Sequence, residues 1–246
     1  MIQAIPAPLR RTFRPLLIPF VRKLEKRRLS QLYASLVSPG DLVFDVGAHT
    51  GEMAKLLLAL GTKVICIEPQ PACLEVLSGL FQGNPKVAIE PVGVGSELGK
   101  LELSVCSEGP QISTFASKWK EGRFAGSNWD QKVEVEVTTL DRLINKHGAP
   151  KFIKIDVEGF ETEVLKGLGR PVPFVCFEFT REFLSDAKTC MERLETFGSV
   201  RYQVSLYTRY RFALSGWVTS DDLMSFLNGY EGADLCGDIY ARTSAA

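Results

Sequence analysis

Four acidic side chains stand at the ends of apolar segments and could together form a chemically active ring. They are Asp45, Glu68, Asp156 and Glu178. Packing alone does not require an acid at the end of one apolar strand after another. A ring of carboxylates suits a cationic cofactor, a hydroxyl group that loses its proton, or a divalent metal. Capping of the helix that follows is the alternative explanation for individual acids.

The first of these acids opens a glycine-rich segment, DVGAHTG, at residues 45–51. Gly47 lets the backbone turn sharply where a strand ends, and Gly51 permits close approach at the start of a helix. In nucleotide-binding α/β folds an acid at the end of the next strand accepts hydrogen bonds from ribose hydroxyls. Glu68 stands at that place. The candidate cofactor-binding residues of this half are Asp45, Gly47, Ala48, His49, Gly51 and Glu68.

The residues of this turn favour S-adenosylmethionine over a dinucleotide as the ligand. A dinucleotide site has the pattern GxGxxG and a helix N-terminus that receives a pyrophosphate. Here the glycines are separated by Ala-His-Thr, and Glu52 adds negative charge to the first helical turn. S-adenosylmethionine carries no phosphate, and Asp45 is placed to meet its cationic part. Singly, these residues are also explained as turn glycines and as acids that interact with a helix dipole.

Apolar periodicity places these residues on alternating strands and helices. Strands are expected at 41–46, 63–68 and 86–94, with a helix at 51–60 and another opened by Pro69 and Pro71. Continuous strands rich in Val and Ile form parallel sheets that are covered on both faces. In such open sheets, ligands bind beyond the carboxyl ends of the strands. The acids and the glycine turn are therefore expected at one edge of the sheet.

The second half resumes this alternation after a less regular stretch. Segments 100–106 and 132–140 predict half-exposed strands, and the loop 107–131 between them is long enough to be a lid or a binding loop. Further strands are expected at 152–157, 174–179, 201–207 and 238–242, and helices at 139–147, 160–168, 186–196 and 220–228, the last capped by Ser220 or Asp221. The loop aromatics Trp119, Phe124 and Trp129 are expected to help line an acceptor site, with core packing as the alternative.

Composition limits the partners. The chain has no net formal charge, but residues 1–28 hold eight basic side chains and one acidic one, so the remainder is net negative. No nucleic acid is therefore expected as a partner of the main body. The six cysteines form no CxxC pair and no group with histidine. No disulfide framework or zinc site is expected, no metal ligands are assigned, and a cytoplasmic location fits best.

The basic N-terminus is expected to form a helical extension over residues 1–40. As a helix, residues 1–28 would carry an apolar face that includes Leu16 and Phe20, with arginines opposite. That face either packs on the rest of the protein as a lid or makes a weak contact with an anionic membrane surface. The apolar patch is too short to cross a membrane.

The chain resembles the FkbM-type methyltransferases over about residues 40–180. The resemblance rests on DVGAHTGEMA (45–54), IEPQPACLEVL (67–77), PVGVGSELGKLEL (91–103), TTLDRLI (138–144) and above all KIDVEGFETEVLKG (154–167). It implies a class I methyltransferase domain over 41–246, with a seven-stranded, mostly parallel sheet, helices on both faces and a terminal antiparallel strand. It also implies S-adenosylmethionine as methyl donor, and Gly93 and Asp156 complete the candidate cofactor contacts. His49 and the pair Pro91-Val92 depart from the family, which commonly has Asn and Asn-Ala there.

The resemblance usually implies O-methylation of a hydroxyl on a sugar or a natural product, so a small-molecule or glycan acceptor is expected. Such a transfer depends on positioning of the reactants and is helped by a general base. Asp156 is the first candidate for this base, and Glu161 and Glu178 are the other candidate catalytic residues, with His49 in reserve.

Two other functions stay open. A catalytically silent S-adenosylmethionine-binding protein would keep the pair of Asp45 and Glu68 and lose the acid at position 156, which this chain retains. An NAD-linked oxidoreductase would need a proton relay of the Tyr-x-x-x-Lys type, and the sequence contains none.

Overall fold

The structure is a computed structural model that describes residues 24–109, 112–121, 125–207, 210–232 and 235–243. Most of the predicted N-terminal amphipathic segment, including Leu16 and Phe20, lies outside the described residues, as does Phe124 of the long loop. Residues 24–34 are helical, as expected for part of the extension. Among the described residues, no helix has the length and apolar character that crossing a membrane requires.

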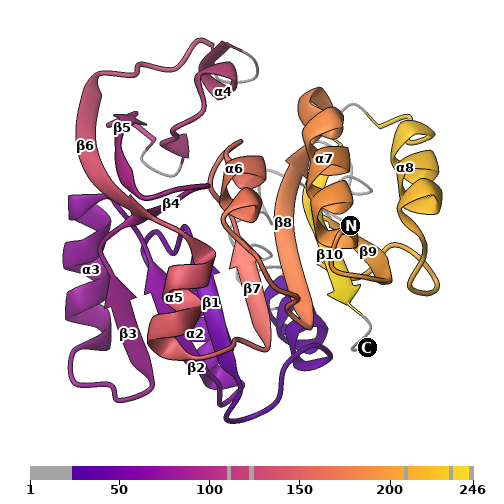
Figure 1. The fold of residues 1–246 in the computed structure, drawn as a ribbon, viewed down its shortest axis with the longest axis horizontal. Coiled ribbons are helices and arrows are strands. Elements are labelled where there is room, and N and C mark those ends of the chain that lie inside the picture. Colours follow the sequence, from indigo (N-terminus) through magenta and orange to yellow (C-terminus); the bar gives the residue numbers. More distant parts are fainter. Residues whose placement is uncertain (1–23, 110–111, 122–124, 208–209, 233–234, 244–246) are drawn as a thin grey trace, which may run out of the picture.

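A seven-stranded sheet runs through the molecule in the order β3-β2-β1-β7-β8-β10-β9 (Figure 1). β10 runs antiparallel to β8 and to β9, and the other neighbouring pairs are parallel. This arrangement confirms the predicted mostly parallel sheet with a terminal antiparallel strand. The strands are β1 (Leu42–Val46), β2 (Lys63–Ile67), β3 (Val87–Glu90), β7 (Phe152–Ile155), β8 (Phe174–Thr180), β9 (Val200–Leu206) and β10 (Cys236–Thr243).

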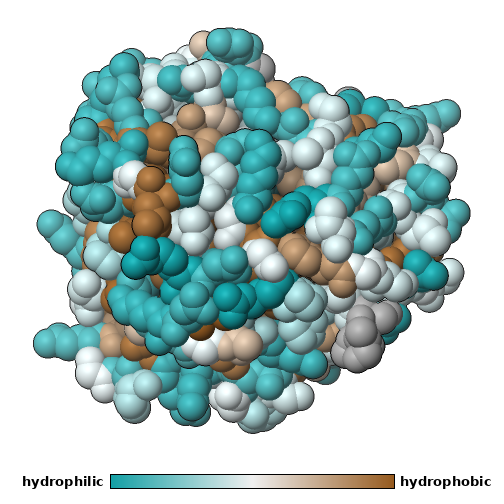
Figure 2. Space-filling model, viewed as in Figure 1, coloured by the Kyte–Doolittle hydropathy of each residue, from teal (hydrophilic) through white to brown (hydrophobic). Residues whose placement is uncertain are grey.

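Two apolar cores cover the two faces of this sheet. One core lies under α5 (Leu140–His147), α6 (Glu161–Lys166), α7 (Leu184–Glu195) and α8 (Ser220–Asn228). The other lies under α2 (Glu52–Ala59), α3 (Pro71–Phe81) and the helical residues 24–34. The face seen in Figure 2 is largely hydrophilic with small hydrophobic patches, as expected where amphipathic helices turn their apolar sides to a sheet.

The helical residues 24–34 and the turn after them pack against the second core. Leu32, Tyr33, Leu36 and Val37 are buried there, and the Tyr33 ring packs edge-on against Phe152 of β7. This part of the predicted extension therefore contributes to the folded unit. The domain boundary at residue 40 stays a prediction.

A second, three-stranded sheet stands near the carboxyl ends of β1 and β7 (Figure 1). It has the order β4-β6-β5, with β4 (Gly93–Val94), β5 (Gly99–Val105) and β6 (Gln131–Thr138), and the short helix α4 (Ser117–Glu121) follows β5 along the chain. The prediction of one strand over 86–94 was wrong, because this segment divides between the two sheets. Pro91 has no amide hydrogen for the ladder, so the chain leaves the large sheet there.

The remaining elements agree with the predicted rhythm, with two differences at helix starts. A 3-10 helix, η3 (Arg181–Phe183), precedes α7. The N-cap of α8 is Thr219 instead of Ser220 or Asp221, since its Oγ1 accepts a hydrogen bond from the Asp222 amide at 3.2 Å. Either position satisfies the same free amides of a first helical turn.

Candidate active site

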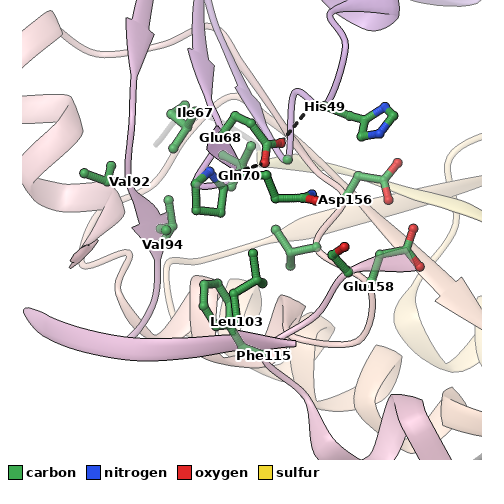
Figure 3. Close-up of a pocket in the computed structure, with 16 residues that line it drawn as sticks. His49, Ile67, Glu68, Gln70, Val92, Val94, Leu103, Phe115, Asp156 and Glu158 are labelled. Carbon is green, nitrogen blue, oxygen red and sulfur yellow. Dashed lines mark hydrogen bonds between the residues drawn. The ribbon is translucent and has the colours of Figure 1, made fainter. Parts of the chain in front are cut away.

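A cavity open to solvent lies at the carboxyl ends of β1, β2 and β7 and contains about 490 Å³ of unfilled space. Its wall is partly apolar and partly formed by groups that can bind a polar ligand (Figure 3). The apolar residues include Ile67, Val92, Val94, Leu103 and Phe115, and the polar ones include His49, Glu68, Gln70, Asp156 and Glu158.

The glycine turn forms one side of this cavity and requires glycine at position 47. Gly47 has φ +83°, and a Cβ atom there would lie 1.9 Å from the carbonyl oxygen of Asp156. The amides of Gly47 and Ala48 donate to the carbonyl of Ile67 at 2.9 and 3.1 Å. The ends of β1, β2 and β7 are thereby brought into direct backbone contact. His49, with φ +46°, continues the turn.

Glu68 follows β2 and anchors this turn from the other side. Its carboxylate accepts hydrogen bonds from the backbone amides of His49 at 2.8 Å and Gln70 at 2.9 Å (Figure 3). Burial raises the pKa of Glu68, and these hydrogen bonds oppose the rise. Each carboxylate oxygen has a second lone pair, so the side chain retains acceptor capacity for a ligand in the cavity.

Three of the predicted cofactor-binding residues do not line the cavity and instead lie on the side of the turn that faces the protein interior. Ala48 is buried in the second core. Gly51 has φ +81°, and a Cβ atom there would lie 2.9 Å from both Leu77 and Phe81, so this glycine leaves room for these α3 side chains at the start of α2. Asp45 lies within β1, where burial raises its pKa to about 7. Its Oδ2 is buried without a hydrogen-bond partner among the described residues.

Glu52 is not positioned to discriminate between cofactors in the way we expected. It does not line the cavity, its side chain is exposed, and its Oε1 lies 2.5 Å from Lys55 Nζ. An exposed, paired charge exerts little influence at a distance. The choice against a dinucleotide therefore does not rest on this residue.

A second group of acids converges beside the cavity. Asp156 follows β7, Glu158 lies two residues further along, and Glu178 belongs to the neighbouring strand β8. One carboxylate oxygen from each lies within 4.8 Å of those of the other two. Burial, followed by the charge of Asp156, raises the pKa of Glu158 to about 9 and raises that of Glu178 well above its usual range. The Tyr207 hydroxyl donates to Glu178 Oε1 at 2.7 Å.

Lys154 is the residue that sequence reasoning missed. It is almost completely buried within β7, and its Nζ lies 2.8 Å from Asp238 Oδ1 and 3.3 Å from Asp156 Oδ2. Burial acts to lower the pKa of this ammonium, but the charges of Asp156 and Asp238 outweigh it and raise the pKa. The position of this lysine inside the apolar segment FIKI could have indicated a buried charge in the sequence. Asp238 had no local signal, because β10 brings it here from 84 residues away.

Glu161 holds the loop that carries Glu158. Its Oε1 accepts hydrogen bonds from the amides of Val157 at 3.3 Å and Gly159 at 3.2 Å, and burial raises its pKa to about 7. Glu161 and Glu178 do not line the larger cavity. They line a smaller one of about 290 Å³.

The smaller cavity also receives one of the loop aromatics. Trp119 is buried, lines this cavity and stacks on Phe183 with ring centroids 5.6 Å apart. Trp129 is half-buried and lines neither cavity. The long loop thus places Trp119 beside Glu161 and Glu178, and its Phe115 lines the larger cavity.

The strand order, the glycine turn and the acids at the carboxyl ends of the strands together define a methyltransferase-type α/β fold of class I. Residues 45–209 match the methyltransferase FkbM domain. The chain therefore belongs to the FkbM methyltransferase family, which uses S-adenosylmethionine as methyl donor.

Individual relatives are distant. A methyltransferase of Sordaria araneosa, sdnD, is 28% identical over 157 residues, which span 51% of this chain and 60% of the relative. Among solved structures, the precorrin-6y C5,15-methyltransferase of Geobacter metallireducens is similar with a TM-score of 0.45 and 14% identity, covering 90% of this chain and 88% of that one. The O-methyltransferase of Thermotoga maritima has a TM-score of 0.43 and 13% identity, covering 88% and 65%. The fold class rests on the strand order and the family, because such TM-scores do not define a fold.

Proposed function

We propose that the protein transfers the methyl group of S-adenosylmethionine to a hydroxyl oxygen of a small-molecule acceptor, such as a sugar or another natural product. The observation that carries this proposal is the placement of Glu68 and Asp156 on one cavity, on either side of the Gly47 turn (Figure 3). One acid is suited to a nucleoside and the other to a reacting hydroxyl.

The nucleoside end would lie between Glu68 and the apolar wall. The free lone pairs of Glu68 would accept the ribose hydroxyls, and Ile67, Val92 and Phe115 would cover the adenine. Gly93 lines the same wall and has no room for a side chain, since a Cβ atom would lie 2.9 Å from the Phe115 ring.

The reacting end would lie at Asp156. When bound, S-adenosylmethionine supplies a methyl group that is activated by its sulfonium charge. Asp156 borders the cavity with a side chain that is 36% exposed, and it would orient the acceptor hydroxyl and take its proton. The Oε1 of Glu161 accepts from two backbone amides and that of Glu178 from Tyr207, so these two acids would act by positioning and by their charge.

Calorimetry tests the donor half of this proposal. We expect S-adenosylmethionine to bind at one site per chain and NAD not to bind. Glu68→Gln should weaken the binding about 10- to 100-fold, the loss expected for hydrogen bonds to a charged acceptor. Glu75→Gln, at an exposed position of α3, is the matched control and should leave the affinity unchanged. Binding of NAD without S-adenosylmethionine would contradict the proposal.

The acceptor half is tested by release of S-adenosylhomocysteine. The full chain is incubated with S-adenosylmethionine and a panel of free sugars and hydroxylated natural products. Release that depends on a hydroxylated acceptor is expected. Tight binding of S-adenosylmethionine with no release on any acceptor would favour the catalytically silent alternative.

A further inference from the structure

The acids beside the cavity form an arrangement that matches a metal site. Asp156, Glu158 and Glu178 each offer one carboxylate oxygen, and these atoms lie within 4.8 Å of one another. Oxygens bound to one Mg²⁺, Mn²⁺ or Ca²⁺ ion at about 2.0–2.6 Å are separated by at most about 4–5 Å. We propose that these three carboxylates bind a hard divalent cation of the Mg²⁺ and Mn²⁺ class.

An unpartnered atom in the cluster points independently to a ligand. The Oε2 of Glu178 is shielded from solvent and has no hydrogen-bond partner among the described residues. The other oxygen of the same carboxylate is occupied by the Tyr207 hydroxyl. A buried carboxylate oxygen with no donor is costly. A cation bound among the three carboxylates supplies the missing partner.

Charge balance at the site also favours a cation. Asp156, Glu158 and Glu178 share their surroundings with Lys154, whose Nζ lies closer to Asp238 than to Asp156. One ammonium group does not neutralise four carboxylates. A divalent ion held among the three carboxylates would offset the repulsion between their charges.

The donor atoms select the kind of ion. All three are carboxylate oxygens, which suit Mg²⁺, Mn²⁺ and Ca²⁺, whereas Zn²⁺ sites are usually built with histidine or cysteine. Three protein ligands leave further coordination positions open. An acceptor hydroxyl bound at one of them would lose its proton more readily. This catalytic role rests on the proposed function, whereas binding of the ion does not.

Electron paramagnetic resonance of Mn²⁺ tests the site on the full chain. We expect one saturable Mn²⁺ ion per chain, displaced by Mg²⁺. Glu158→Gln and Glu178→Gln should each weaken the apparent affinity at least tenfold. Glu163→Gln is the matched control, because Glu163 lies on α6 outside the cluster and pairs with Lys166. The control should bind Mn²⁺ as the wild type does.

Each outcome bears on the proposal. No saturable binding at millimolar Mn²⁺, or equal affinity in the wild type and both cluster variants, would overturn it. Circular dichroism confirms that each variant is folded, and Asp156→Asn replaces any variant that is not. Titration with S-adenosylhomocysteine separates the two proposals: loss of nucleotide binding with Mn²⁺ binding intact would refute the proposed function alone.

Discussion

Replacement of Gly47 by alanine is the sharpest perturbation of the turn on which the cavity depends. The added Cβ atom would lie 1.9 Å from the carbonyl oxygen of Asp156 and 2.9 Å from its carbonyl carbon. Because both contacts are with backbone, no side-chain rotation relieves them. Gly40→Ala is the matched control, since Gly40 also has a positive φ (+91°) but a Cβ atom there would meet no described neighbour within 4 Å.

The two variants separate the cost of the backbone conformation from the cost of the clash. An alanine held at positive φ costs about 1–2 kcal/mol, which is the whole effect expected for Gly40→Ala. For a chain of this length that corresponds to a fall in Tm of roughly 2–8 °C. In Gly47→Ala the contact with the Asp156 carbonyl must also open from 1.9 Å to at least 3.0 Å. Moving two strand ends apart by that much should bring the total loss above about 4 kcal/mol.

Urea denaturation and calorimetry with S-adenosylmethionine measure the two consequences. Gly40→Ala should keep wild-type affinity. Gly47→Ala should lose at least tenfold in affinity at a temperature where it is still folded, because the turn and Asp156 border the same cavity. Equal stability of the two variants, or unchanged affinity in Gly47→Ala, would refute the inference that this glycine joins β1 to β7.

Three further changes test the acids and their counter-charge. Asp156→Asn should abolish methyl transfer and leave binding of S-adenosylmethionine measurable by calorimetry; full turnover would rule Asp156 out. Lys154→Met should lower the free energy of unfolding at pH 7 by about 3–5 kcal/mol, because it leaves the buried carboxylate of Asp238 without its counter-charge; a loss below about 1 kcal/mol in urea would contradict this. The pKa of Glu161 rises from 4.5 to about 7 on folding, so the folded state holds an extra proton between these values and stability falls as pH rises through that interval. Glu161→Gln should therefore show a smaller fall in urea midpoint between pH 5 and pH 8, and a steeper fall would reverse the sign of the argument.

The elements that sequence analysis placed correctly are those with strong local signals. β2 and β8 are apolar runs buried on both faces, and α5 has a clear amphipathic repeat that ends at Gly148. The segment 86–94 was misjudged because its apolar pattern continues through Pro91, whereas pairing does not. The division of one segment between two sheets depends on tertiary structure, and hydrophobic periodicity does not predict it.

The site was predictable to the extent that it follows strand ends. Glu68 and Asp156 reach one cavity because parallel strands end at one edge of a sheet. Asp45 was expected to face the ligand, yet the alternation of side chains along β1 buries it among neighbours on the α2 side. The backbone of Glu158 has φ +54°, which sets the direction of its side chain. A glutamate rarely adopts this conformation, so the sequence could not predict it.

The terminal antiparallel strand determines the electrostatics of the reacting half. β10 lies between β8 and β9, with Asp238 paired in register opposite Glu178. Lys154 is thereby held between Asp238 and Asp156, so part of its charge neutralises Asp238, which does not line the larger cavity. The carboxylate of Asp156, which borders the cavity and lies farther from Lys154 Nζ than Asp238 does, is therefore only partly neutralised by this lysine. A cationic methyl donor and the divalent ion proposed above would each be favoured beside such a carboxylate.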